Sequence, residues 1–169
     1  MGGLNNIIFI MKSISTYILE QSISKSGTIN IFIGCSKSKE SKTDKAEDLY
    51  TGDLFKKSLA IAKGFKNARI YILSSKYGLV KLDDRLRPYD DYISDKSAEE
   101  NESWAEKVIS QMKHSHINFN DKTYFFCGED YYRNLIDKFS DAEPVFYKDF
   151  GHSLKKLDSI MKKYNISEE

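Results

Sequence analysis

The sequence predicts an α/β fold, a three-layer sandwich with a mainly parallel sheet of four or more strands. Short apolar runs rich in β-branched residues alternate with segments whose apolar residues recur at helical spacing. Strands that alternate with helices form parallel sheets covered on both faces. We expect one domain over residues 28–164. It follows an N-terminal extension, residues 1–27, in which apolar residues at helical spacing suggest a short helix.

Composition limits the setting and the partners. The 26 Lys and Arg residues balance 25 Asp and Glu residues, so any contact with nucleic acid would come from a local basic patch. Two cysteines and three histidines make neither a disulfide framework nor a zinc set. We therefore expect no metal, no cofactor and a reducing cytoplasmic location. The apolar stretch at residues 7–11 is too short for a membrane span, so we expect no membrane partner.

The first half of the domain reads as strand, helix and strand. Residues 28–34, TINIFIG, are apolar and β-branched, which indicates a buried strand. Residues 50–65 have helical spacing, and Thr51 or Asp53 is the expected N-cap. Residues 68–74, ARIYILS, predict the second strand. A long stretch without a clear period then follows, over residues 80–96.

The second half repeats the alternation. Ser97 and Glu100 form a capping box, and the helix they start carries apolar residues every four positions. Residues 123–128 predict a third strand and residues 131–139 a helix. Residues 144–148 predict a fourth strand, and residues 153–164 a closing helix.

An unusual polar stretch follows each predicted strand. The four stretches are residues 34–40, 73–79, 127–132 and 149–153. Ligands of open parallel sheets bind outside the carboxyl ends of the strands. We therefore expect the four stretches to lie along one edge of the sheet and to contribute to one site.

The stretch GCSKSK after the first strand suits an anion such as phosphate. Backbone N–H groups, the Ser36 hydroxyl and the ammonium groups of Lys37 and Lys39 all favour negative charge. The spacing is not that of a Walker loop. A loop of solvated lysines is an equally good interpretation of this stretch alone. Cys35 could be a nucleophile, but no histidine lies near it in the sequence and a small buried cysteine is commoner, so we expect it only to contribute to the binding site.

The stretch SSKYGL after the second strand is more specific. Ser74, Ser75 and Lys76 can bind a phosphate or carboxylate, and Tyr77 can stack on a base or cover the core. Gly78 is expected to supply a backbone conformation that side chains disfavour. We expect Lys37, Lys39 and Lys76 to converge on one anion site.

Two carboxylates are candidates for acid–base chemistry. Asp90 lies beside Tyr89 in the long loop, which we expect to fold back and bring Asp90 near Ser75 and Lys76. Its alternative is ordinary turn chemistry. Glu129 begins the stretch after the third strand, where it either faces the site or caps a helix. The neighbouring candidates for substrate contacts are Gly128 and Tyr131.

Four segments taken in order resemble a known group of proteins. These are CSKSK, LYTGDLFKKSLAIA, YILSSKYGLVKLDDRLRPYD and GEDYYRNL. Together they resemble an uncharacterised bacterial and phage family related to the YaaA-like peroxide-stress proteins. The opening segment is also similar to the uracil-DNA-glycosylase-like domain of archaeosine synthases. The resemblance covers about residues 30–157 and implies an α/β fold and a link to nucleic acid or nucleobases. The helix-hairpin-helix-like DNA element of YaaA proteins has no counterpart in this chain.

The residues leave three classes of function open. The first is an enzyme that processes a nucleotide or nucleobase, a hydrolase or transferase acting at the N-glycosidic bond, in which lysines hold phosphate and a carboxylate activates water or the leaving group. The second is a non-catalytic DNA- or RNA-binding protein of a YaaA-like stress-response type. The third is a partner-binding module. A concave pocket favours the enzyme, an open basic groove the nucleic-acid binder, and a flat apolar edge the module.

Overall fold

The computed structural model describes residues 27–146 and 150–166. The expected helix in the N-terminal extension lies outside these residues, as do residues 147–149 of the predicted fourth strand and its following stretch. Within the described residues, no helix is both long enough and apolar enough to cross a bilayer.

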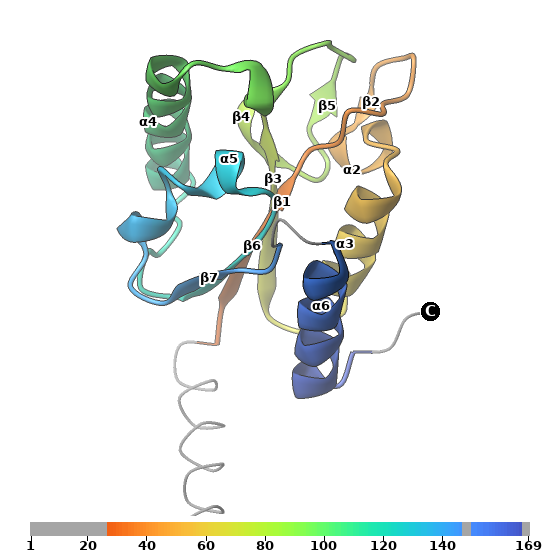
Figure 1. Ribbon diagram of the computed structural model, residues 1–169, viewed down its shortest axis with the longest axis vertical. Coiled ribbons are helices and arrows are strands. Elements are labelled where there is room, and N and C mark those ends of the chain that lie inside the picture. Colours follow the sequence, from red (N-terminus) through yellow and green to blue (C-terminus); the bar gives the residue numbers. More distant parts are fainter. Residues whose placement is uncertain (1–26, 147–149, 167–169) are drawn as a thin grey trace, which may run out of the picture.

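A five-stranded, mostly parallel sheet forms the centre of the fold, which confirms the predicted α/β class (Figure 1). Strand β1 (Ile29–Gly34) pairs in parallel with β3 (Ala68–Ser74) on one side and with β6 (Lys122–Phe126) on the other. Strand β7 (Ala142–Pro144) continues the parallel set beside β6, and β4 (Gly78–Lys81) runs antiparallel along β3. Strand order is β4-β3-β1-β6-β7.

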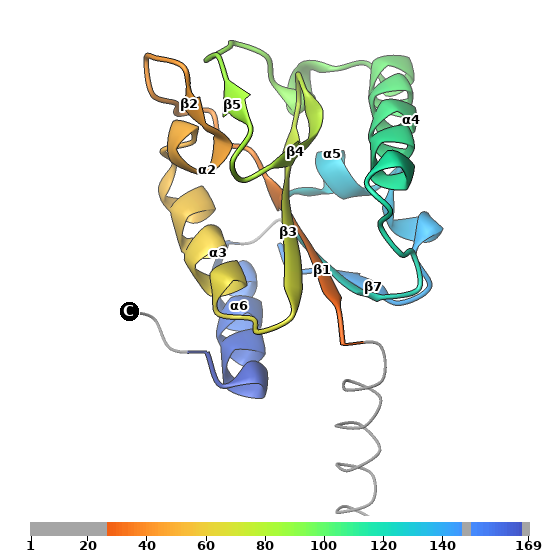
Figure 2. The same ribbon diagram turned by 180° about the vertical axis from the view of Figure 1, so that it is seen from behind.

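Helices lie on both sides of this sheet (Figures 1 and 2). Helices α3 (Asp53–Lys63) and α6 (Phe150–Tyr164) lie on one side, and α4 (Ala98–His114) lies on the other. Two single-turn helices, α2 (Ala46–Leu49) and α5 (Glu129–Tyr132), are near the carboxyl ends of the strands. Short 3₁₀ helices span Ile93–Asp95 and Ile136–Lys138.

Side-chain alternation along β1 divides the core into two apolar clusters. Ile31 and Ile33 pack with side chains of α3 and α6, whereas Phe32 points to the opposite face and packs with side chains of α4. All three side chains are almost fully buried. A strand covered on both faces has no polar face to expose, which is why this segment reads as a continuous apolar run.

Two strands that the sequence did not reveal lie in or overlap the region predicted to be irregular, residues 80–96: β4 begins just before it and β5 (Arg85–Leu86) lies within it. Strand β4 turns back along β3, and β5 pairs with β2 (Asp44–Lys45) in a small second sheet. Both strands are only two to four residues long. A pattern of period two cannot be recognised over so few residues.

Three smaller predictions also need correction. The helix predicted over residues 131–139 is the single turn α5 followed by a 3₁₀ turn. The fourth strand ends at Pro144 instead of starting there. Neither Thr51 nor Asp53 caps α3, because the N-cap is Gly52 and Asp53 is already the first helical residue. The predicted capping box is confirmed: Ser97 Oγ accepts from Glu100 N, and the Glu100 carboxylate accepts from Ser97 N.

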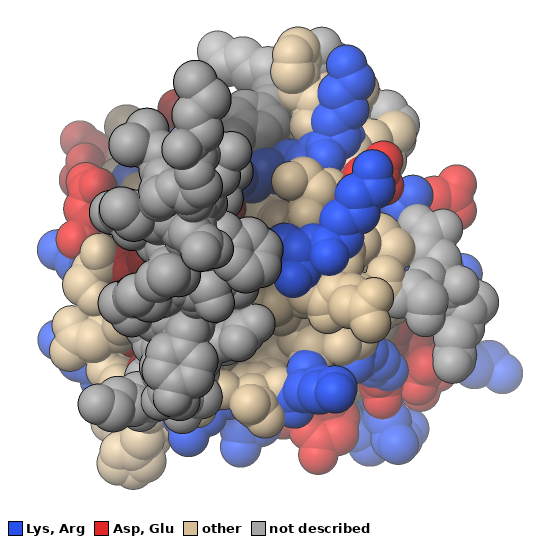
Figure 3. All heavy atoms as spheres, turned by 90° about the horizontal axis from the view of Figure 1, so that it is seen from below, with Lys and Arg blue, Asp and Glu red and all other residues tan. Residues whose placement is uncertain are grey.

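Charges of both signs are mixed at the amino ends of the strands. Figure 3 looks at this end from below and shows acidic as well as basic side chains around its rim. The opposite end, where the parallel strands finish, carries the polar stretches that the sequence singled out.

Candidate functional site

The polar stretches after β1, β3 and β6 meet at the carboxyl edge of the sheet, as predicted. Parallel pairing places Gly34 opposite Leu73, and Ile33 opposite Phe126, so the three chains leave the sheet side by side. Cys35 N donates to Leu73 O at 3.0 Å, which ties the first two stretches together. The β2–β5 pair and α2 border the same edge (Figure 2).

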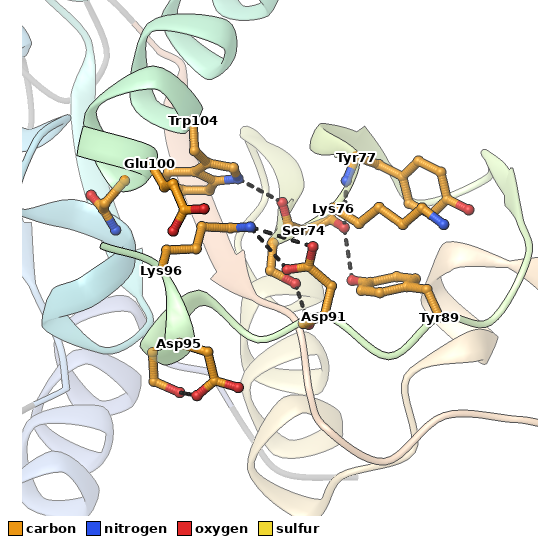
Figure 4. A network of polar contacts seen from close by, with 12 residues as sticks. Ser74, Lys76, Tyr77, Tyr89, Asp91, Asp95, Lys96, Glu100 and Trp104 are labelled. Atoms are coloured by element: carbon orange, nitrogen blue, oxygen red, sulfur yellow. Dashed lines mark hydrogen bonds and ion pairs between the residues drawn. The ribbon is translucent and has the colours of Figure 1, made fainter. Parts of the chain in front are cut away.

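A chain of hydroxyl groups holds the long loop against the end of β3. Tyr89 OH is 2.7 Å from Ser74 Oγ and 2.8 Å from Tyr50 OH. Ser74 Oγ also accepts from Tyr77 N at 3.0 Å, and the Ser74 carbonyl accepts from the Trp104 indole at 2.9 Å (Figure 4). Ser74 is fully buried. The loop therefore folds back over the strand end, as predicted, and Tyr89 anchors it there.

The stretch SSKYGL is the tight turn between β3 and β4, and side chains of α4 form hydrogen bonds with its backbone. Gly78 has a φ of +79°, which confirms the expected conformation. Gln111 of α4 accepts from Leu79 N at 2.8 Å and donates to the Tyr77 carbonyl at 3.1 Å. Lys107 donates to the Lys76 carbonyl at 3.1 Å. These bonds fix the backbone and leave the Lys76 side chain exposed.

Three lysines from two polar stretches gather over shared tyrosine rings. The Lys39 ammonium is 4.3 Å from the centroid of the Tyr89 ring, and the Lys76 ammonium is 5.8 Å from the same centroid. Lys37 and Lys39 both lie over Tyr92, at 4.9 and 5.8 Å. We call this group the lysine–tyrosine cluster; its members are Lys37, Lys39, Lys76, Tyr77, Tyr89 and Tyr92.

Burial shifts the pKa values of ionisable groups in this cluster and of Tyr50 beside it. Partial burial lowers the pKa of Lys39, although the Cys35 thiol and the Asp90 and Asp91 carboxylates favour its charged form. Burial raises the pKa of Tyr50 to about 12 and raises that of Tyr89 further. Both hydroxyls therefore stay protonated at neutral pH and can donate hydrogen bonds.

A cavity of about 290 Å³ opens beside the lysine–tyrosine cluster, between the ends of β1 and β6 and the start of α3. Its walls are largely apolar and aromatic, and Ser58 lies on the α3 side. We call it the α3 cavity. Its lining residues are Ile33, Gly34, Cys35, Ser36, Gly52, Asp53, Leu54, Phe55, Ser58, Phe126, Cys127, Gly128, Tyr131 and Phe146.

Cys35 stands between the α3 cavity and the lysine–tyrosine cluster. It lines the cavity, and its Sγ is 3.1 Å from Tyr131 OH, which also lines the cavity. On the cluster side, Cys35 adds to the rise that burial causes in the pKa of Tyr89. Burial raises the pKa of Tyr131 as well. Cys127 is a buried free thiol whose pKa is raised by burial, so it remains protonated.

The start of α3 presents polar groups to this cavity. Gly52 N donates to Ser36 Oγ at 3.2 Å, which fixes the first stretch against the helix start. Ser36 Oγ in turn donates to Ser38 O at 2.6 Å. The first N–H groups of a helix have no partner within the helix and carry partial positive charge. The cavity thus combines apolar walls with a few directed polar groups.

The two predicted acid–base residues occupy different places. Asp90 is exposed, raises the pKa of the Tyr92 hydroxyl through a hydrogen bond and its charge, and lies close enough to favour the charged form of Lys39. The expected approach to Ser75 is made instead by its neighbour: Ser75 Oγ donates to the Asp91 carbonyl at 2.6 Å. Glu129 is exposed at the first position of α5, and its carboxylate has no hydrogen bond or ion pair within the described residues.

Asp91 has a structural role. Its carboxylate lies 3.0 Å from the Lys96 ammonium, and both side chains are partly shielded from solvent (Figure 4). With the Ser75 bond to its carbonyl, this ion pair fixes the loop at the point where it passes the end of β3. The backbone next to Asp90 is therefore fixed by these contacts, while the Asp90 carboxylate remains accessible to solvent.

Sequence reasoning missed three residues of this edge. Tyr50 lies buried beneath the lysine–tyrosine cluster, Asp53 lines the cavity instead of capping α3, and Ser58 lies on its inner wall. Ser58 carried a recognisable signal, because it is a polar residue on the helix face that also bears Ile61 and Phe65. The sequence carried no such signal for Tyr50 and Asp53, since their roles depend on contacts with distant segments.

Comparison with known families places the chain. Residues 31–159 match the family model described as a family of unknown function (DUF6884). The chain belongs to this family. The match covers β1 from Ile31 onward, the other strands of the main sheet in full, and every lining residue of the α3 cavity. No curated protein and no solved structure matches the chain. Among residues 27–146 and 150–166, no group of three or more His, Cys, Asp or Glu side chains is arranged to hold a metal ion.

Proposed function

We propose that the protein is a nucleotide- or nucleobase-processing enzyme that cleaves or exchanges an N-glycosidic bond. The observation that carries the proposal is the pairing of the lysine–tyrosine cluster with the α3 cavity, with Cys35 between them. Ammonium groups over aromatic rings suit a phosphate next to a base or sugar. A concave pocket with a few polar groups suits a small ligand.

The proposal assigns roles by position. Lys37, Lys39 and Lys76 bind the phosphate, and the glycosidic bond lies near Cys35 and Tyr131. Asp90 is the better-supported candidate for the general base because it lies beside Lys39. Glu129, whose carboxylate makes no hydrogen bond or ion pair within the described residues, remains the second candidate.

A non-catalytic binder of single-stranded DNA or RNA is the alternative. It is supported by the location of the three lysines on rings that are only partly buried, since exposed rings can stack on unpaired bases. The third possibility required a flat apolar edge. The carboxyl edge is instead hollowed and carries lysines, which gives a partner-binding module no support.

Two finer points accompany the proposal. We take the fold to be a three-layer sandwich, supported by apolar clusters on both faces of the sheet. We take the site of action to be a reducing cytoplasm, supported by the two free thiols.

Replacement of single lysines tests binding. Lys39→Met and Lys76→Met should each weaken binding of nucleoside monophosphates and short oligonucleotides, measured by calorimetry, because each removes one positive charge beside the phosphate. For oligonucleotides, each change should also reduce the salt dependence by about one contact. Lys66→Met, an exposed lysine beyond the far end of the sheet, is the control and should change neither quantity. Unaltered binding in both site variants would refute the phosphate assignment.

Chromatographic detection of free base tests catalysis. Incubation with nucleotides and oligonucleotides should release a base, and Asp90→Asn should lower the rate by about 10²-fold or more while binding persists. Glu129→Gln tests the second candidate, and it should retain most of the rate if Asp90 is the base. A reaction that Asp90→Asn leaves at full rate would remove Asp90 as the base. Binding without any released base would favour the non-catalytic alternative.

A further inference from the structure

The Ser58 hydroxyl is buried and has no hydrogen-bond partner within the described residues. Ser58 is fully buried in α3, and no described residue forms a hydrogen bond with its Oγ. Two other buried oxygens share this property within the described residues. Asn30 Oδ1 belongs to a side chain whose amide group donates to Asn118 O and Thr123 Oγ1, and Asp91 Oδ1 is paired with Lys96. Ser58 alone of the three lines the α3 cavity.

An unpaired hydroxyl in this position is unfavourable for the empty protein. Burying a polar group without a hydrogen bond destabilises the fold. A serine within a helix can bond back to the carbonyl one turn earlier, but Ser58 makes no such bond. Alanine in its place would also be the better helix former. A polar atom delivered by a ligand would satisfy the hydroxyl.

The cavity walls define the class of ligand. Phe55, Phe126 and Tyr131 contribute aromatic surface, and Ile33 contributes aliphatic surface. Aromatic and apolar walls favour a flat ring system. The polar groups of its lining belong to Ser58, Asp53 and the start of α3. At about 290 Å³ the cavity has the size of a site for one small ligand.

We propose that the α3 cavity receives the heterocyclic base of the ligand and that the Ser58 hydroxyl forms a hydrogen bond to the polar edge of that base. This inference rests on the proposed function, in which the lysine–tyrosine cluster holds the phosphate. It adds a specificity-determining residue: Ser58 recognises the base, whereas the lysines recognise the phosphate. Cys35 lies at the junction, where base and sugar would meet.

Ser58→Ala distinguishes recognition of the base from recognition of the phosphate, because it removes the hydroxyl and little else. The probes are a series of nucleoside monophosphates and ribose 5-phosphate, which lacks the base. We expect the variant to bind its best nucleotide about 2- to 13-fold more weakly, the range for one hydrogen bond, and to bind ribose 5-phosphate as the wild type does. Its melting temperature without ligand should be unchanged or higher. Ser110→Ala, on the exposed side of α4, is the matched control.

The outcomes distinguish this inference from the proposed function. If nucleotide binding depends on Lys39 and Lys76 but Ser58→Ala binds every nucleotide as tightly as the wild type, the hydroxyl makes no bond to the base. The inference is then wrong, while the proposed function stands. An equal loss for nucleotides and ribose 5-phosphate would also overturn it, because the base would not be what Ser58 recognises. Failure of the wild type to bind any nucleotide would overturn both.

Discussion

The end of β3 and the α3 cavity lie at the same edge of the sheet, but their buried hydroxyl groups differ in whether they are hydrogen-bonded. At the end of β3, Ser74, Tyr50 and Tyr89 satisfy one another's hydroxyls, and α4 binds the turn through Gln111. In the α3 cavity, the Ser58 hydroxyl has no hydrogen-bond partner among the described residues, and the walls are largely apolar.

This difference indicates that one region supports the site and the other contacts the ligand. A network whose members are all bonded is rigid and gains little from a ligand. A pocket with an unpaired polar group gains a hydrogen bond when a ligand enters. The end of β3 therefore positions the lysines, and the α3 cavity is where a ligand has most to contribute.

Substitution of Gly78 should have the largest effect on the supporting region at the end of β3. Gly78→Ala forces a side chain into a φ of +79° and places its Cβ in steric overlap with the side-chain amide of Gln111. Backbone strain and the loss of the Gln111 bonds should lower the free energy of unfolding by about 2–4 kcal/mol, measured by denaturant titration.

The control for this change lies at the cavity. Gly128 has a φ of −70°, and a Cβ there would meet nothing within 4 Å. Gly128→Ala should lower the free energy of unfolding by less than about 1 kcal/mol. Equal losses in the two variants would show that the β3–β4 turn is no more constrained than the cavity rim.

Strands β1, β3 and β6 and the long helices could be predicted because each is fixed by its own sequence. Residues 68–74 were predicted as a strand and form β3 with the same limits, and the capping box of Ser97 and Glu100 is a local pattern of four residues. The lysine stretches were also recognisable, since each directly follows a strand. Their meeting at one edge follows from parallel pairing.

The features that the sequence did not predict are those that depend on contacts between residues far apart in the chain. Strand β5 exists because β2, about forty residues earlier, lies beside it. Asp91 rather than Asp90 meets Ser75, a difference of one residue that depends on how the loop packs. The cavity depends on the way in which α3 meets the ends of β1 and β6, and no local pattern in the chain encodes such a space.

Tyr89 provides a smaller test of the supporting region. Tyr89→Phe keeps the ring beneath Lys39 and Lys76 but removes the hydroxyl that joins Ser74 to Tyr50. The loss should lower the free energy of unfolding by about 1–3 kcal/mol near neutral pH, because Tyr50 OH is left in a buried site without this partner. Tyr77→Phe is the matched control. The Tyr77 hydroxyl makes one long bond, 3.3 Å, to the Arg87 carbonyl at the surface, so its loss should change the free energy by no more than about 0.5 kcal/mol.

Alkaline pH distinguishes a hydroxyl network from simple packing. Burial raises the pKa of Tyr89 above its ordinary value of 10.0, so above that pH the folded chain keeps a proton that the unfolded chain releases. The folded state then binds more protons than the unfolded state, and stability falls as pH rises. Each pH unit above the unfolded pKa removes about 1.4 kcal/mol through this tyrosine. Tyr89→Phe has no such proton to lose, so the gap in stability between wild type and variant should narrow above about pH 10. A gap that stays constant from pH 8 to pH 11 would show that the Tyr89 hydroxyl is not held in the protonated, hydrogen-bonded state, and that the end of β3 is supported by ring packing alone.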